Sequence, residues 1–217
     1  MISSLSLKNR VRLLLNEERN DPNITLISGN TRNIDSYIDA LMPEAVMFVQ
    51  MNSRIGGVNP KRVDIADNEI TATENGSGYF KLPADFLRLL SLTMNGWERP
   101  CTKLYPQDSA VAMAQKSKYT RAGWSKPVCV EGIVDGSRVL YFYSLPENVV
   151  PSVKSFVYDA EYDAENGLFC DNRLLIEAVA YQCAALVYNV FEKRDSASTM
   201  LSFAAALCNG NEPNVKE

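Results

Sequence analysis

The chain contains no histidine. Catalytic Ser-His-Asp and Cys-His systems, and the zinc sites that use histidine ligands, are therefore excluded. The sequence also lacks G-x-x-x-x-G-K-[ST] and G-x-G-x-x-G strings, so the familiar glycine-rich cradles for nucleotides are missing. These absences argue against an enzyme, and we predict no catalytic residue, no metal and no cofactor.

Cysteine is sparse and widely spaced, and no C-x-x-C pair occurs. An odd number with such spacing argues against a disulfide framework or a zinc site, and favours reduced thiols in a cytosolic folding environment. The first twenty residues contain no apolar signal segment, so we expect no secretory signal. The five positions are Cys101, Cys129, Cys170, Cys183 and Cys208.

The composition is that of an ordinary globular protein. Of 217 residues, 46% are hydrophobic and 22% charged, so the chain can bury one sizeable core or a core with a satellite domain. The net charge of −4 creates no general attraction to nucleic acid. A contact with DNA would need a local basic patch.

The first segment, residues 1–57, is predicted to be helical. Apolar side chains recur at helical spacing from residue 6 to about residue 19, which indicates an amphipathic helix with Ser4 or Ser6 as its N-cap. Polar residues and turn formers over residues 20–32 predict a loop.

A second helix is expected to begin near residue 33. Pro43 predicts that this helix ends or kinks there, since proline lacks the backbone N–H that an interior position donates. Proline is well suited to a first helical turn, so a third helix is expected to follow, through Val46 and Val49.

Residues 58–168 are predicted to form an antiparallel β-sandwich or barrel-like domain, because their hydrophobic period changes to two. The long strand before Asn95 should place Leu90, Leu92 and Met94 on one face. In a last strand, one face should carry Phe156, Tyr158 and Tyr162. A short helix is expected near residues 109–116, and hairpin turns are expected at Asn75-Gly76, Asn95-Gly96 and Asp135-Gly136.

Residues 169–208 are predicted to be helical, followed by a flexible tail over residues 209–217. The first of these helices, residues 174–191, is apolar nearly all round and must be buried on several sides. Glu177, Gln182 and Asn189 disfavour a membrane span. We expect instead that the helix lies between the N-terminal helices and a neighbouring subunit.

Both ends of the chain are thus helical and should form one bundle, from which the β-rich middle emerges. The predicted fold class is α+β: a helical bundle from the N- and C-terminal segments with an inserted antiparallel β domain.

Candidate interface residues fall in two groups. Residues 115–126 gather basic side chains around aromatic ones, a composition found in protein interfaces and in single-strand nucleic-acid sites, but also in solvated loops. The second group consists of apolar residues of the C-terminal helices. The candidates are Tyr119, Arg121 and Trp124 in the first group, and Leu186, Tyr188, Phe203 and Leu207 in the second.

A row of alternating acids follows the last predicted strand. An extended backbone would place all four carboxylates on one side, as in a calcium site, but the spacing fits no EF-hand loop. A charged, solvated strand end is the simpler interpretation. The row consists of Asp159, Glu161, Asp163 and Glu165.

Several stretches of the sequence resemble phage head-to-tail adaptor proteins, such as the gatekeeper, upper tail tubular and first connector ring proteins of short-tailed phages and related gut (crAss-like) phages. The stretches are IDALMPEAVMFV (38–49), LPADFLRLLSL (82–92), NGWERP (95–100), SKPVCVEG (125–132), RVLYFYSLPENVVPSVKSFVYDAEY (138–162) and LLIEAVAYQCAALVYNVFEKRD (174–195). They cover most of the chain, and they are scaffold motifs, not an active-site signature.

The resemblance implies a virion structural protein at the head–tail junction, assembled in the host cytoplasm. It implies a homo-oligomeric, dodecameric ring that binds the portal protein after genome packaging and contacts the next tail or ring protein. Viral DNA would pass through the channel without sequence-specific binding, and no membrane is involved. The acidic balance suits such a conduit, since a strongly basic lumen would grip phosphates.

Two other function classes stay open. A virion-associated carbohydrate-active enzyme would need a deep pocket with two opposed carboxylates. A glycan- or receptor-binding tail module would display aromatic side chains on loops at one end of the sheet.

Overall fold

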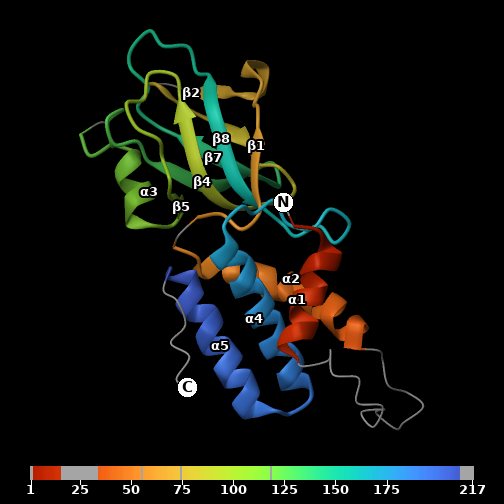
Figure 1. The fold of residues 1–217 in the computed structure, drawn as a ribbon. Coiled ribbons are helices and arrows are strands. Elements are labelled where there is room, and N and C mark those ends of the chain that lie inside the picture. Colours follow the sequence, from red (N-terminus) through yellow and green to blue (C-terminus); the bar gives the residue numbers. More distant parts are fainter. Residues whose placement is uncertain (1, 16–33, 55, 74, 118, 211–217) are drawn as a thin grey trace, which may run out of the picture. The chain divides into compact units, whose positions relative to one another are not determined.

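A computed structural model describes residues 2–15, 34–54, 56–73, 75–117 and 119–210. The chain divides into two compact units (Figure 1). Met1–Asn59 and Glu161–Glu217 form the helical unit, and Pro60–Ala160 form the β unit. The predicted α+β class, with helical ends and an inserted sheet domain, is confirmed.

The β unit is shorter than the predicted range of 58–168, because its last strand ends at Ala160. The residues that follow belong to the helical unit. There, Ile2 and Leu168 form an antiparallel bridge, with the Ile2 N–H donating to the Leu168 carbonyl at 2.9 Å. Tyr162, predicted to continue the face of Phe156 and Tyr158, instead packs against the helical core. The predicted loop over residues 20–32 and most of the predicted tail, residues 211–217, lie outside the described residues.

Four long helices build the helical unit: α1 (Ser4–Leu14), α2 (Ile34–Asn52), α4 (Arg173–Val190) and α5 (Arg194–Cys208). Helix α4 lies at the centre and packs against the other three (Figure 1). Of its side chains, only Arg173, Asn189 and Val190 are exposed. The expectation that a neighbouring subunit covers this helix is therefore wrong, because α1, α2 and α5 of the same chain already do so.

The ends of the helices differ from the sequence predictions in two places. Helix α1 is capped by Ser3, whose hydroxyl accepts from the Ser6 N–H at 3.3 Å, and not by Ser4 or Ser6 themselves. Helix α2 runs unbroken through Pro43, so the predicted second and third helices are one.

Burial explains the continuity of α2. Ile38 and Met42 before the proline, and Ala45, Val46 and Val49 after it, are all in the core of the helical unit. This packing outweighs the loss of one hydrogen bond at Pro43. Among the described residues, none of the helices has the length and apolar character that crossing a membrane requires.

Two sheets build the β unit. The three-stranded sheet has the order β1-β8-β4, and its strands are antiparallel: β1 (Pro60–Val63), β8 (Val153–Ala160) and β4 (Phe86–Met94). The five-stranded sheet has the order β2-β3-β7-β6-β5, with β2 (Thr71–Thr73), β3 (Ser77–Lys81), β7 (Ser137–Phe142), β6 (Cys129–Val134) and β5 (Leu104–Pro106). Strand β5 pairs parallel with β6, while the other pairs are antiparallel. The short 3₁₀ helix η1 (Asp67–Glu69) and helix α3 (Ala110–Gln115) complete the unit.

Aromatic rings fill the core of the β unit. Phe80 of β3 meets Phe156 of β8 edge-on, with 5.4 Å between the ring centroids. Phe86 of β4 stacks on Phe156, and Tyr158 stacks on the same ring at 5.2 Å. Such aromatic pairs contribute beyond the area they bury.

The faces of β4 do not alternate as predicted. The register of β4 against β8 shifts between Phe86 and Arg88 and again between Leu89 and Ser91. Each shift inserts an extra residue, and a bulge of this kind turns the following side chains to the other face. Phe86, Leu89, Leu92 and Met94 are buried as a result, while Leu90 is half-buried.

Two of the three predicted hairpins are present. Asp135 and Gly136 have φ values of 49° and 75° and join β6 to β7 by a two-residue turn. The turn at Gly76 joins β2 to β3. At Asn95-Gly96 the chain does turn, with only Gly96 at positive φ, but no returning strand follows beyond a single bridge between Leu92 and Cys101. The Leu92–Cys101 bridge lies on the edge of β4 opposite to β8, and the pairing extends no further there.

One ion pair holds a buried charge in this sheet. The side chain of Asp159 is fully buried, and its Oδ2 lies 2.8 Å from Nη2 of Arg88. Removing one partner of such a pair leaves a charge in a medium that solvates it poorly. The exposed Arg62 on β1 provides a matched position without this burial.

We predict that Arg88→Leu lowers the free energy of unfolding by about 2–4 kcal/mol, because it removes the cationic partner of the buried Asp159 carboxylate. Arg62→Leu should change it by less than about 0.5 kcal/mol. Urea unfolding of both variants measures the difference. Equal effects of the two substitutions would show that the ion pair does not stabilise the sheet.

Candidate functional site

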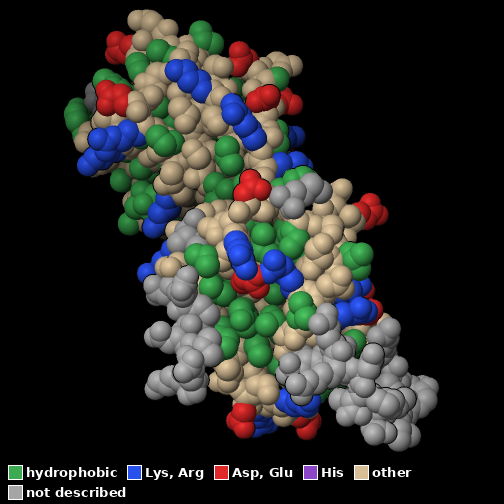
Figure 2. Space-filling model, viewed as in Figure 1, with side chains coloured by type: hydrophobic (Ala, Val, Ile, Leu, Met, Phe, Trp, Pro, Cys, Tyr) green, Lys and Arg blue, Asp and Glu red, His purple; other side chains and the backbone are tan. Residues whose placement is uncertain are grey.

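On the face of the β unit that Figure 2 shows, the charged side chains form no broad patch of one sign that could recognise a partner. Acidic and basic side chains are interspersed there, and neither sign forms a continuous field. Recognition would therefore depend on a local feature. Among the described residues of the β unit, two local features are considered: the loop at residues 116–126 and a groove between the two sheets.

The loop begins at the end of α3, a short helix capped by the Ser109 hydroxyl. Gln115 closes this helix and is only 3% exposed. Its Nε2 donates to the Val111 carbonyl at 3.0 Å, and its Oε1 accepts from the Ala122 N–H at 3.0 Å. Gln115 thus ties the far side of the loop back to the helix.

Arg121 supplies a second tie. Its Nε donates to the Gln115 carbonyl at 2.9 Å, and its Nη1 donates to the Asn75 carbonyl at 3.0 Å. The guanidinium also lies over the ring of Tyr143 at 5.9 Å. Arg121 was predicted as an interface residue, but these contacts show that it positions the loop.

The backbone of the loop is held at further points. The Ser144 hydroxyl donates to the Ala122 carbonyl, and the Glu98 N–H donates to the Trp124 carbonyl at 3.2 Å. Thr120 bonds back to the Ala114 carbonyl at 2.7 Å. The described part of the loop, residues 116, 117 and 119–126, is thus exposed but tied to α3 and to neighbouring segments by hydrogen bonds.

This fixed loop displays two aromatic side chains. Tyr119 is 86% exposed and Trp124 is 48% exposed. Large aromatic rings held out of the core are the residues that most often anchor protein interfaces. The loop contains no acidic residue, and Lys116 and Lys126 are exposed at its two ends.

The second group of predicted interface residues is placed differently. Leu207 is 3% exposed and lies in the core of the helical unit, and the hydroxyl of the buried Tyr188 donates to the Leu14 carbonyl at 3.3 Å. Both are corrected to core residues. Leu186 and Phe203 are half-buried, and Phe203 meets Tyr181 edge-on with 5.4 Å between ring centroids. Their apolar character is explained by packing within the chain.

The four alternating acids do not lie along one strand, because β8 ends at Ala160, directly after the first of them. Asp159 is paired with Arg88, as described above. Asp163 lies in a turn, where hydrogen bonds from the Asn166 side chain and the Glu165 N–H lower the pKa of its carboxyl. Within the ranges that the structure describes, no group of three or more histidine, cysteine, aspartate or glutamate residues could hold a metal ion.

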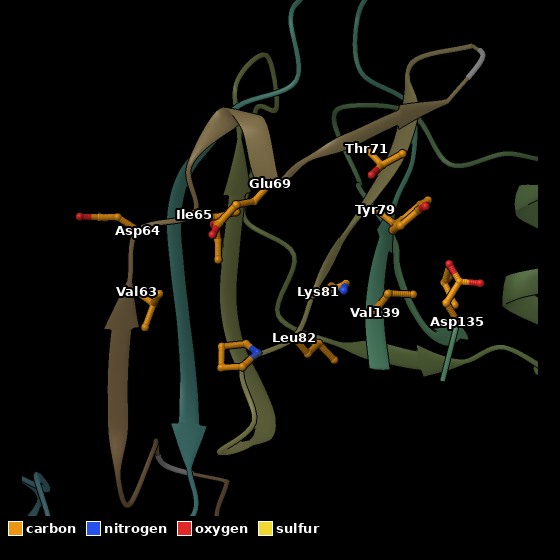
Figure 3. A pocket seen from close by; sticks show the side chains of 12 residues that line it. Val63, Asp64, Ile65, Glu69, Thr71, Tyr79, Lys81, Leu82, Asp135 and Val139 are labelled. Carbon is orange, nitrogen blue, oxygen red and sulfur yellow. The ribbon is translucent and has the colours of Figure 1, made fainter. Parts of the chain in front are cut away.

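A groove that the sequence did not indicate lies between the two sheets (Figure 3). Its volume is about 550 Å³, within the range of roughly 300–1,000 Å³ that ligand pockets occupy. Its lining comes from β1, β2, β3, β6, β7 and their connections. The lining residues are Val63, Asp64, Ile65, Glu69, Thr71, Tyr79, Lys81, Leu82, Pro83, Val134, Asp135 and Val139. No local pattern reveals it, since it arises where separate strands diverge.

Two buried thiols meet in the same unit. A hydrogen bond from the Cys129 thiol, acting against desolvation, lowers the pKa of Cys101 to about 7. Burial raises the pKa of Cys129 well above its usual value. Both thiols are free, as the sequence predicted for all five cysteines.

Comparison of the chain with known protein families finds no matching family model, and comparison with curated proteins finds no match either.

The two hydrogen bonds by which Gln115 ties the loop to α3 can be tested. We predict that Gln115→Met, which keeps the volume but removes both hydrogen bonds, raises the exchange rate of the Ala122 amide roughly tenfold, since each bond contributes about 1 kcal/mol. Native-state hydrogen exchange measures this rate. The exposed Lys116→Met variant is the control and should leave it unchanged. Equal protection in all three proteins would contradict the assigned role.

Cys101 predicts a pH dependence of stability. Its folded pKa of about 7 lies below the ordinary value of 9.0, so the thiolate stabilises the fold fully above pH 9 and the contribution is lost as the pH falls through 7. The difference in unfolding free energy between wild type and Cys101→Ser should therefore be larger at pH 9 than at pH 6. Denaturant titrations measure it.

A control for that series is Cys183→Ser. Burial raises the pKa of Cys183 to about 12, so the contribution of this thiol to the unfolding free energy of the wild-type protein decreases as the pH rises above 9. Between pH 6 and pH 9 the difference between wild type and Cys183→Ser should therefore stay constant, while the difference for Cys101→Ser grows. Parallel curves over this range would contradict the perturbation of Cys101.

Proposed function

We propose that the chain is a virion structural protein, a head-to-tail connector whose copies form a dodecameric ring between the portal and the tail. The observation that carries this proposal is the architecture. The sequence stretches that resemble head-to-tail adaptors imply a helical bundle closed by both chain ends with an inserted β domain, and the chain has that organisation.

One argument for a ring has to be withdrawn. The apolar helix was expected to offer surplus hydrophobic area to sister copies, but α4 is covered within its own chain. Contacts between copies must come from other surfaces. A ring needs two different, complementary patches on each copy, since one face of a subunit meets another face of the next.

The loop at residues 116–126 supports a role in binding. It holds Tyr119 and Trp124 in solvent on a backbone fixed by Gln115 and Arg121, which limits the entropy lost when a partner binds. The same display of aromatic rings favours a second candidate, a glycan- or receptor-binding tail module. Aromatic side chains stack on sugar rings as readily as they anchor proteins.

The connector proposal is tested by sizing the 24.2 kDa chain by light scattering, alone and with its cognate portal protein. We expect the portal to gain mass equivalent to one copy of the chain per portal subunit. A chain that stays monomeric and ignores the portal, while a saccharide changes Trp124 fluorescence, would reject the connector and favour the glycan-binding module.

A further inference from the structure

We propose that the loop at residues 116–126 of one copy docks into the groove between the sheets of a second copy. The contact would be head-to-tail and would form the interface between copies in the ring. This inference therefore rests on the function proposed above. The argument has three parts: the shape of the groove, the charges on both sides, and the placement of loop and groove in the β unit.

The groove offers an apolar floor of suitable size. Val63 and Ile65 come from β1 and the segment after it, and Leu82 and Val139 come from the opposite side (Figure 3). A volume of about 550 Å³ accommodates a bulky aromatic side chain. Trp124 and Tyr119 are the large aromatic side chains that the β unit holds in solvent, and aromatic rings bury well in such pockets.

The charges of the two surfaces are complementary. The lining carries three exposed acids, Asp64, Glu69 and Asp135, against one lysine, Lys81. In Figure 3, Glu69 lies beside Ile65 over the cavity and Asp135 lies at its other side, while Asp64 points away. The loop of an incoming copy brings Lys116 and Lys126 and no acid.

This arrangement favours a second copy of the chain over an unrelated apolar ligand. Opposite charges around an apolar contact set the orientation of an interface and raise its association rate. Lys81 does not oppose the contact, because an ammonium group can lie against the face of an incoming aromatic ring.

Placement in the fold allows an intermolecular contact. Hydrogen bonds to Asn75 and Ser144 hold the loop in place. None of the residues that line the groove belongs to the loop. In this arrangement the groove is open to the loop of another copy.

The contact is heterologous, since loop and groove are different surfaces of one domain. Repeating such a contact produces a ring when the rotation between copies closes, and an open filament when it does not. The groove and loop thus supply the two complementary patches that α4 does not.

Two variants make the test specific. The loop variant carries Tyr119→Ala and Trp124→Ala, and it keeps an intact groove. The groove variant carries Glu69→Lys and Asp135→Asn, and it keeps an intact loop. All four positions are exposed, and asparagine tolerates the positive φ of residue 135, so both variants should fold; circular dichroism checks this.

Sedimentation of the full-length proteins up to about 1 mM reads out association. We expect wild type to form dimers and larger species, and each variant alone to associate at least tenfold more weakly. An equimolar mixture of the two variants should form dimers but nothing larger, because only one loop–groove contact is left intact. Higher salt should weaken each contact.

The same variants on the cognate portal separate this inference from the ring itself. If the loop variant or the groove variant assembles on the portal as wild type does, the docking contact is overturned while the connector function stands. If loop-dependent association persists but the portal is ignored, the connector function fails and the contact stands. Loss of binding to another tail protein with unchanged self-association would assign the groove to that partner and overturn the proposal.

Discussion

The constraint on which the rest of the structure depends is that α4 has almost no polar face. A helix of this kind must be covered on all sides, and α1, α2 and α5 cover it from both ends of the chain. The N- and C-terminal segments are thereby brought together, although more than a hundred residues separate α2 from α4. The residues between them leave the bundle at Asn59 and return at Glu161, so they have to form a core of their own. The two-unit organisation follows from the burial of one helix.

Much of this organisation could be predicted, because it depends on hydrophobic period. The change from helical spacing to alternation marked the insert, and Asp135-Gly136 marked its clearest turn, since both residues adopt positive φ. The errors occur where tertiary contacts override a local signal. Helix α2 continues through Pro43 because of the packing around it. The bulges of β4 arise from its pairing with β8, a strand far away in sequence.

The candidate sites were predictable to very different degrees. Aromatic and basic residues at 116–126 are conspicuous in sequence, but composition could not separate Arg121, which is engaged in holding the loop, from Trp124, which is displayed. Leu207 and Tyr188 were misassigned because an apolar helical residue has the same pattern in a core as in an interface. The groove could not be predicted at all. Val63 and Val139 belong to separate strands, Leu82 follows a third, and the three share only the space between them.

The division of roles between the two units follows from these placements. In the helical unit, the apolar side chains of α4 pack within the chain, while other apolar side chains, among them Leu5, Met47 and Met51, are exposed. The β unit keeps an apolar groove partly open and holds two aromatic rings in solvent. Holding the rings in place requires a rigid loop, because a mobile loop would lose more conformational entropy on binding than the contacts return. Gln115 at the end of α3 and Arg121 in the loop provide that rigidity, because their polar side chains bond to backbone groups. A chain organised this way can be stable on its own and still carry the directional surface that the proposed connector needs.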